Sequence, residues 1–204
     1  MDTLAKILES RLIIKLRPLP GRPILPWLAA LCSGGVFAAE LPMDNPHSAD
    51  ALQCGRKLFP DLVLGAGNVL TGSDAQKAIA AGARYISSPG YSSSLSKLCK
   101  DHDVLYLPRC MTPTELLAVK EDGLPAVFLF APHLWGSLGM MDALIDAFPS
   151  LSFLASDLSH SSVSTVHTHP RIGASSVSGL ESLSPEALVG QCHHILASIV
   201  SSDS

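Results

Sequence analysis

A lysine and a glutamate stand in apolar segments where charged residues are unexpected. Lys15 lies within LIIKL (12–16), and Glu40 is the next-to-last residue of VFAAEL (36–41). A desolvated lysine can attack a carbonyl carbon, and a nearby carboxylate can transfer protons as a general acid or base. The alternative is structural: Glu40 forms an ion pair with Arg17 or Lys15, since a buried carboxylate needs such a partner.

Two arginines near the ends of apolar segments could add a binding function. Arg17 and Arg109 can each hold a carboxylate in a bidentate manner. The alternative for Arg109 is that it fills space and pairs with Asp44 or Glu40. Both interpretations remain open at this stage.

A divalent metal is a further option at the same place. Its candidate ligands carry imidazole or carboxylate groups: Glu40, His133, Asp157 and His160. Arg17 and Arg109 would lie beside them and repel a cation. We therefore expect no metal and no cofactor.

Short apolar segments alternate with stretches of helical pattern. The apolar segments have the length of strands and occupy 12–16, 36–41, 62–66, 83–88, 104–109, 126–131, 151–155 and 171–177. The helical stretches occupy 22–33, 47–58, 73–81, 92–100, 112–121 and 137–147. Ser73 and the Thr112/Glu115 pair predict helix starts, and Gly82 and Gly123 predict helix ends.

Eight strands alternating with helices predict an α/β fold, a small (β/α)₈ barrel in a single domain over 1–204. A helix at 1–11 and another at 185–200 would lie at the two termini. The Ser- and His-rich loop 158–170 has no helical period, so the seventh helix is predicted to be degraded. In a barrel the outward face packs on helices, so Lys15 and Arg17 should point inward, with Arg17 at the C-terminal rim.

Composition narrows the class of protein. Of the 204 residues, 47% are hydrophobic and 16% charged, which excludes a disordered chain. A net charge of −4 and 5% aromatics argue against a nucleic-acid partner. The five scattered cysteines form no CxxC pair, and the apolar stretch 23–41 is broken by Pro26 and Gly34-Gly35. We therefore expect a cytoplasmic protein with no membrane partner.

Three motifs in order resemble one enzyme family. LGAGNVL (64–70), AGARYISSPG (81–90) and LPRCMTPTEL (107–116) are similar to motifs of the 2-keto-3-deoxy-6-phosphogluconate / 4-hydroxy-2-oxoglutarate (KDPG/KHG) aldolases. The resemblance runs almost without gaps over about 12–157. It implies a class I aldolase barrel of carbohydrate metabolism, a homotrimer, that cleaves 2-keto-4-hydroxy acids to pyruvate and an aldehyde. The family's proton-relaying Glu is matched by Glu40.

The chain departs from the family at its chemistry. The position of the Schiff-base lysine is Phe128, which has no nucleophile, so the class I route is impossible there. The phosphate loop is replaced by Ser156-Asp157-Leu158, and Asp157 would repel a phosphate. Arg109 and His133 stand where the family has Gly and an acidic residue.

Three hypotheses follow from these departures. The first is a lyase in which Lys15 has replaced the lost lysine, with Glu40 as its catalytic partner. The second is a non-catalytic protein, a possible pseudoenzyme, that binds a small keto acid such as pyruvate. Its substrate-binding candidates, shared with the first, are Arg17, Asn68, Pro89, Arg109 and His133. The third is a scaffold subunit.

Overall fold

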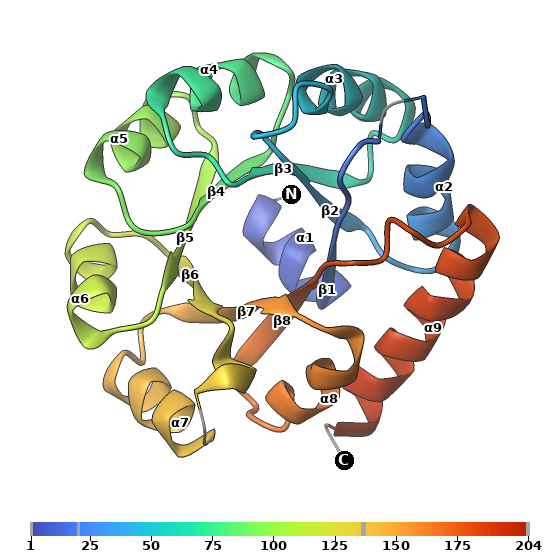
Figure 1. The fold of residues 1–204 in the computed structure, drawn as a ribbon. Helices are drawn as coiled ribbons and strands as arrows, with labels where there is room; N and C mark the ends of the chain where they lie inside the picture. The colour runs from blue at the N-terminus through green and yellow to red at the C-terminus, as the bar shows by residue number, and fades with distance from the viewer. Residues whose placement is uncertain (1, 20, 136–137, 203–204) are drawn as a thin grey trace.

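Eight parallel strands close into a barrel in a computed structural model, which describes residues 2–19, 21–135 and 138–202. Neighbours in sequence are neighbours in the sheet, and β1 pairs with β8, so the predicted (β/α)₈ fold is confirmed (Figure 1). The strands are β1 (Leu12–Lys15), β2 (Ala38–Pro42), β3 (Val63–Gly67), β4 (Tyr85–Ser88), β5 (Leu105–Cys110), β6 (Ala126–Phe130), β7 (Ser152–Leu158) and β8 (Ile172–Val177).

Helices cover the outer side of the barrel, except α1, which lies at one end of it (Figure 1). They are α1 (Thr3–Ser10), α2 (Leu25–Ser33), α3 (Ser48–Leu58), α4 (Gly72–Ala80), α5 (Ser93–Asp101), α6 (Pro113–Glu121), α7 (Leu138–Ala147), α8 (Val163–Val166) and α9 (Pro185–Ser202), with 3-10 turns η1 (Pro132–Leu134) and η2 (His160–Ser162). The predicted stretch 137–147 begins one residue outside the described chain. None of the helices in the described part is long and apolar enough to cross a membrane.

Alternation along the strands divides the core into two parts. Leu12 and Ile14 of β1 pack outward with the helices, whereas Ile13 belongs to a separate cluster inside the barrel. Phe128 of β6 is fully buried in this inner cluster. Lys15, two residues after Ile13, points inward as predicted, toward Glu40 and Asp157.

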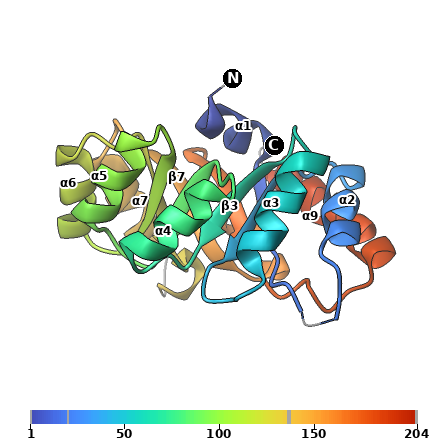
Figure 2. The same cartoon turned by 90° about the horizontal axis from the view of Figure 1, so that it is seen from above.

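Helix α1 closes the N-terminal end of the barrel. It lies over the centre of the ring in Figure 1 and outside one end of it in Figure 2. Leu4 and Ile7 of α1 pack into the inner cluster, and the Asp2 side chain accepts a hydrogen bond from the Leu4 N–H at the start of the helix. The opposite end, where the strands have their carboxyl termini, is the one left for a ligand.

Helix boundaries agree with the predicted signals, with one correction. Thr112 and Glu115 form a complete capping box at α6. Gly82 and Gly123 follow α4 and α6 with φ of +93° and +72°. The N-cap of α4, however, is Thr71, whose hydroxyl accepts from the Asp74 N–H, so the prediction from Ser73 was two residues late.

The seventh repeat is the irregular one, as predicted. Its helix α8 is a single turn, Val163–Val166. The strand before it was predicted to end at residue 155 but continues to Leu158, with a register shift against β8. Asp157 is therefore the next-to-last residue of β7, and its φ of +59° is rare for a residue other than glycine.

Candidate active site

Four charged side chains from four strands meet at the C-terminal end of the barrel. Lys15 of β1 is directly paired with Glu40 of β2, and Lys15 Nζ lies 3.7 Å from Glu40 Oε1. Arg109 of β5 reaches the same oxygen with Nη2 at 3.2 Å. Asp157 of β7 closes the group, with Oδ1 2.6 Å from Lys15 Nζ and Oδ2 3.0 Å from Arg109 Nε. We call these four residues the mouth cluster; cations and carboxylates alternate around it.

Glu40 and Arg109 are the buried members of the cluster, each with 2% of its surface exposed. A buried carboxylate is stable only when its charge and its oxygen lone pairs are satisfied. Arg109 and Lys15 supply the charge, and the Ser87 hydroxyl of β4 donates a hydrogen bond to Glu40 Oε2 at 2.7 Å. Of the two ion-pair partners that the sequence offered for Glu40, the structure has Lys15 rather than Arg17. Of the two carboxylates that it offered for Arg109, the structure has Glu40 rather than Asp44.

The glycines of β3 make room for this arrangement. A Cβ on Gly67 would collide with the Glu40 carboxyl group, and one on Gly65 would collide with the Tyr85 ring. The GAG sequence of β3 is therefore needed for packing inside the barrel, and it touches the catalytic candidate Glu40 directly. From the sequence, GAG was only a point of resemblance to the family, and its packing role was not predicted.

Asp157 is held as a carboxylate. Burial raises the pKa of its carboxyl group, but the charges of Arg109 and Lys15 outweigh burial, and the pKa lies below its ordinary value. Asp157 Oδ2 and Arg109 Nε nevertheless lack a hydrogen-bond partner, although they lie 3.0 Å apart. Their contact is an ion pair with poor hydrogen-bond geometry, whereas Lys15 Nζ donates a hydrogen bond to Asp157 Oδ1.

A cavity of about 150 Å³ opens beside the cluster. Its walls come from β1, β2, β7 and the segments after β1, β3 and β8: Lys15, Leu16, Arg17, Glu40, Pro42, Asn68, Asp157, Ser178 and Glu181. Two of the predicted substrate-binding residues, Arg17 and Asn68, are therefore brought to the same cavity as Lys15 and Glu40. Ser87, Ser178 and Glu181 were missed. The inward alternation of β4 could have identified Ser87.

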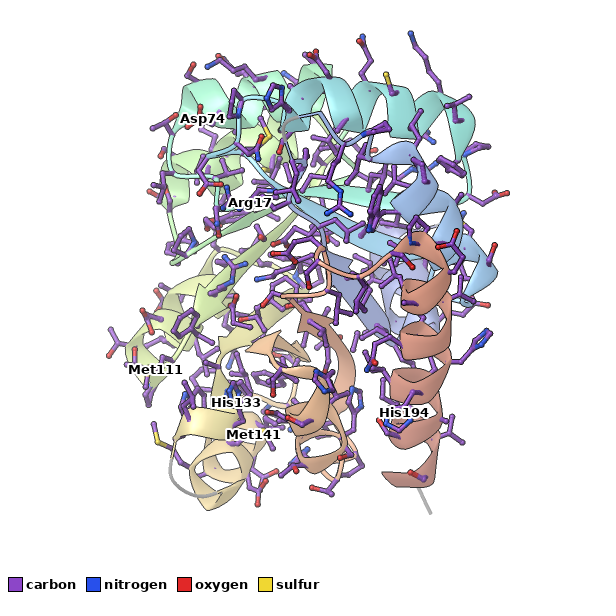
Figure 3. All side chains as sticks on the ribbon, turned by 45° about the vertical axis from the view of Figure 1, so that its right-hand side comes forward. Arg17, Asp74, Met111, His133, Met141 and His194 are labelled. Carbon is purple, nitrogen blue, oxygen red and sulfur yellow. The ribbon has the colours of Figure 1, made fainter. Side chains whose placement is uncertain are left out.

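The other predicted substrate-binding residues lie elsewhere. Arg109 is beneath the cavity and engaged by both carboxylates of the cluster. Pro89 follows β4 in a turn where Ser88 and Tyr106 both donate to the Gly90 carbonyl. His133 is in η1 after β6, and Figure 3 shows it well apart from Arg17. Neither Pro89 nor His133 lines the cavity.

Arg17 is itself held in place at the rim. Its Nη2 donates to both oxygens of Asp44, at 3.1 and 2.9 Å, in an exposed pair. Arg17 is thus near the predicted position but already neutralised. A ligand carboxylate would have to share this guanidinium with Asp44.

Phe128 is packed as part of the inner apolar cluster. It is directly paired with Arg109 on the neighbouring strand and has no exposed surface. Phe128 therefore contributes apolar packing on one side of Arg109. Among the described residues, no group of three or more His, Cys, Asp or Glu side chains is placed to hold a metal ion.

Fold and site together define the class: a small aldolase-type barrel with a lysine and a carboxylate at its C-terminal mouth. The model of the KDPG and KHG aldolase family matches residues 5–173. The chain belongs to this family.

Individual relatives agree with this assignment. The chain is 32% identical over 149 residues to a 2-dehydro-3-deoxy-phosphogluconate aldolase of Treponema pallidum (strain Nichols), covering 72% of this chain and 71% of that protein. A solved 4-hydroxy-2-oxoglutarate / 2-dehydro-3-deoxyphosphogluconate aldolase from TTHB1 is 29% identical. It superimposes with a TM-score of 0.90 over 98% of this chain and 99% of that one.

A third comparison supports the fold alone. A KDPG aldolase from Legionella pneumophila is 21% identical, with a TM-score of 0.86, and covers 96% of this chain and 98% of that chain. In that structure pyruvate is captured as a covalent carbinolamine intermediate.

Proposed function

We propose that the chain is a carbon–carbon lyase that cleaves 2-keto-4-hydroxy acids to pyruvate and an aldehyde, with Lys15 as nucleophile. One observation carries this proposal: Lys15 lines the mouth cavity and lies 3.7 Å from Glu40. Phe128 cannot supply an amine, whereas Lys15 reaches the same end of the barrel from β1. Membership of an aldolase family supplies the reaction type.

The proposed reaction begins when Lys15 has lost its proton. The neutral amine adds to the C2 carbonyl carbon, the carbonyl oxygen gains a proton, and loss of water leaves an iminium ion. Glu40 takes the proton of the C4 hydroxyl while the C3–C4 bond breaks, and the bond's electron pair moves to C3 to form the enamine. The aldehyde leaves, C3 gains a proton, and water releases pyruvate and restores Lys15.

Reductive trapping tests this proposal. Incubation with pyruvate and sodium borohydride should leave a stable adduct on Lys15, located by mass spectrometry of peptides. The yield should increase as pH is raised, because only the neutral amine reacts. Lys15→Ala should abolish the adduct, while Lys97→Ala, which removes an exposed lysine of α5, should not. An adduct on another lysine, or none on a folded protein, would overturn the proposal.

A second candidate is a non-catalytic protein, a pseudoenzyme that binds a keto acid or serves as a scaffold. The observation in its favour is the 2.6 Å contact between Lys15 Nζ and Asp157 Oδ1. An ammonium group held this way, with Glu40 on its other side, is a structural link across the barrel rather than a nucleophile. This candidate expects no borohydride adduct; a rise in melting temperature with pyruvate would then indicate binding, and its absence a scaffold.

We also propose a homotrimer in the cytoplasm. Large apolar side chains are exposed at the ends of β5 and β6 and just after them, at the C-terminal end of the barrel, namely Met111, Phe130 and Leu134. An apolar surface of this kind is typical of a subunit interface. Light scattering should give three times the chain mass. Leu134→Ser should lower this mass, while the matched Leu58→Ser on α3 should not.

The cytoplasm as the compartment is supported by the cysteines. Five free cysteines, three of them buried, fit a reducing compartment.

A further inference from the structure

The charges around the mouth cavity are already balanced without a ligand. Lys15 is paired with Asp157 and Glu40, and Arg17 with Asp44. Arg109, beneath the cavity, is paired with both carboxylates of the cluster. Every cation in this part of the described chain is paired: the carboxylate of a keto acid could share the exposed Arg17 with Asp44, and no further cation is left for a second anionic group.

A further carboxylate makes the cavity slightly acidic. Glu181, in the loop after β8, lines it together with Asp157. Two cations, Lys15 and Arg17, and three carboxylates, those of Glu40, Asp157 and Glu181, line the cavity, which leaves one formal negative charge on its walls. A second anionic group on a ligand, such as a phosphate, would enter against this charge and against the fixed carboxylate of Asp157.

Asp157 is the residue that takes the place of such an anion. Its left-handed backbone, at the end of β7, directs the carboxylate to Lys15 and Arg109. The two cations hold it in its charged form. An incoming anion could reach these cations only by displacing Asp157.

Two neutral polar side chains offer the opposite chemistry. Asn68 and Ser178 line the same cavity, and within the described residues neither side chain has a hydrogen-bond partner. An amide and a hydroxyl can each donate to and accept from a sugar-like hydroxyl group. At about 150 Å³ the cavity is smaller than the roughly 300–1,000 Å³ that is typical of small-molecule pockets. This size favours a short molecule.

We infer that the mouth accepts a short keto acid whose remainder is uncharged and hydroxylated, and that Asp157 excludes substrates with a second anionic group. This inference rests on the proposed function, since it names the substrate class of the same cavity. Asp157 is the specificity-determining residue, with Asn68 and Ser178 as the groups that bind the hydroxyls.

A pair of aldehydes that differ only in a phosphate tests the inference. Condensation of pyruvate with glyceraldehyde should exceed condensation with glyceraldehyde 3-phosphate by at least about tenfold in kcat/KM, given a fixed carboxylate within a few ångströms of the phosphate. Asp157→Asn, which keeps the shape but removes the charge, should narrow or reverse this ratio. The matched control Asp101→Asn removes an exposed carboxylate on α5 and should leave the ratio unchanged.

A binding measurement keeps the inference testable without turnover. Inorganic phosphate should not raise the melting temperature of the unmodified protein beyond the effect of equal ionic strength, but it should raise that of Asp157→Asn. If borohydride trapping fails while phosphate binds only the variant, the lyase proposal falls and the specificity of the cavity stands. Phosphate binding to the unmodified protein, or to neither protein, would overturn the inference.

Discussion

The segment from β3 to α6 and the segment from β6 to β8 differ in the side chains that they bring to the barrel. In the first, Gly65 and Gly67 leave room for Tyr85 and Glu40, and Thr112 caps α6. In the second, Phe128 fills the barrel interior and Asp157 occupies the end of β7. Both segments complete the same closed sheet.

This difference separates residues that the barrel needs for packing and capping from residues at positions that could carry chemistry. The motifs of the first segment are explained by packing and by helix capping, so the barrel needs them whether or not it is catalytic. The second segment includes Phe128 and Asp157, at positions where the resemblance to the family implies a reacting lysine and a binding loop. The charge of Asp157 is balanced by an ion pair across the barrel, with Arg109 of β5.

Phe128→Lys is the most disruptive test of this difference, because it places a lysine at the position where the resemblance to the family implies one. The new ammonium would replace a fully buried ring next to Arg109. We expect a loss of at least about 3–5 kcal/mol in the free energy of unfolding, measured in urea, since packing is lost and a cation is buried beside another.

The same variant should gain no borohydride adduct at position 128. Phe128→Leu is its control and should lose much less stability, because it stays apolar. A stable Phe128→Lys protein with a trapped adduct would show that position 128 is a reactive site rather than a packing position.

Gly67→Ala tests the first segment. The added methyl would collide with the Glu40 carboxyl group, so the carboxylate must move away from Arg109 and Ser87. We expect a loss of about 1–3 kcal/mol in the free energy of unfolding. Gly90→Ala is the matched control, since nothing lies within 4 Å of its added Cβ. Equal stability of the two variants would contradict the packing role of GAG.

The order of strands and helices could be predicted because the signals are local. Alternating apolar residues, Thr112 with Glu115, and glycines after helices act within a few residues of one another. The end of β7 could not, because ASDL is polar in part and its conformation depends on Lys15 and Arg109 from distant strands. For the same reason the partners of Glu40 remained open until the barrel brought four strands together.

Thr112→Ala measures the smaller, purely local contribution of a family motif. Its hydroxyl accepts from the Glu115 N–H, and the Glu115 carboxylate accepts from the Thr112 N–H. Loss of this cap should cost about 1 kcal/mol in the free energy of unfolding. Thr114, two residues later, is exposed, so Thr114→Ala should change the free energy of unfolding little. A similar loss in both variants would assign the effect to helix propensity instead.

Acid should reveal the smallest difference, at Asp157. Its pKa is below the ordinary value in the folded protein, so its contribution to stability is present above the pKa of the unfolded chain. That contribution is lost as pH falls through the lower, folded pKa. The stability of the unmodified protein should therefore decline more steeply below about pH 4 than that of Asp157→Asn. The side chain is one-third exposed, so water screens its charge and keeps the difference small. Parallel stability curves would mean that the pair with Lys15 restrains the shape of the mouth without stabilising the fold, and that strand pairing and apolar packing hold β7 in place.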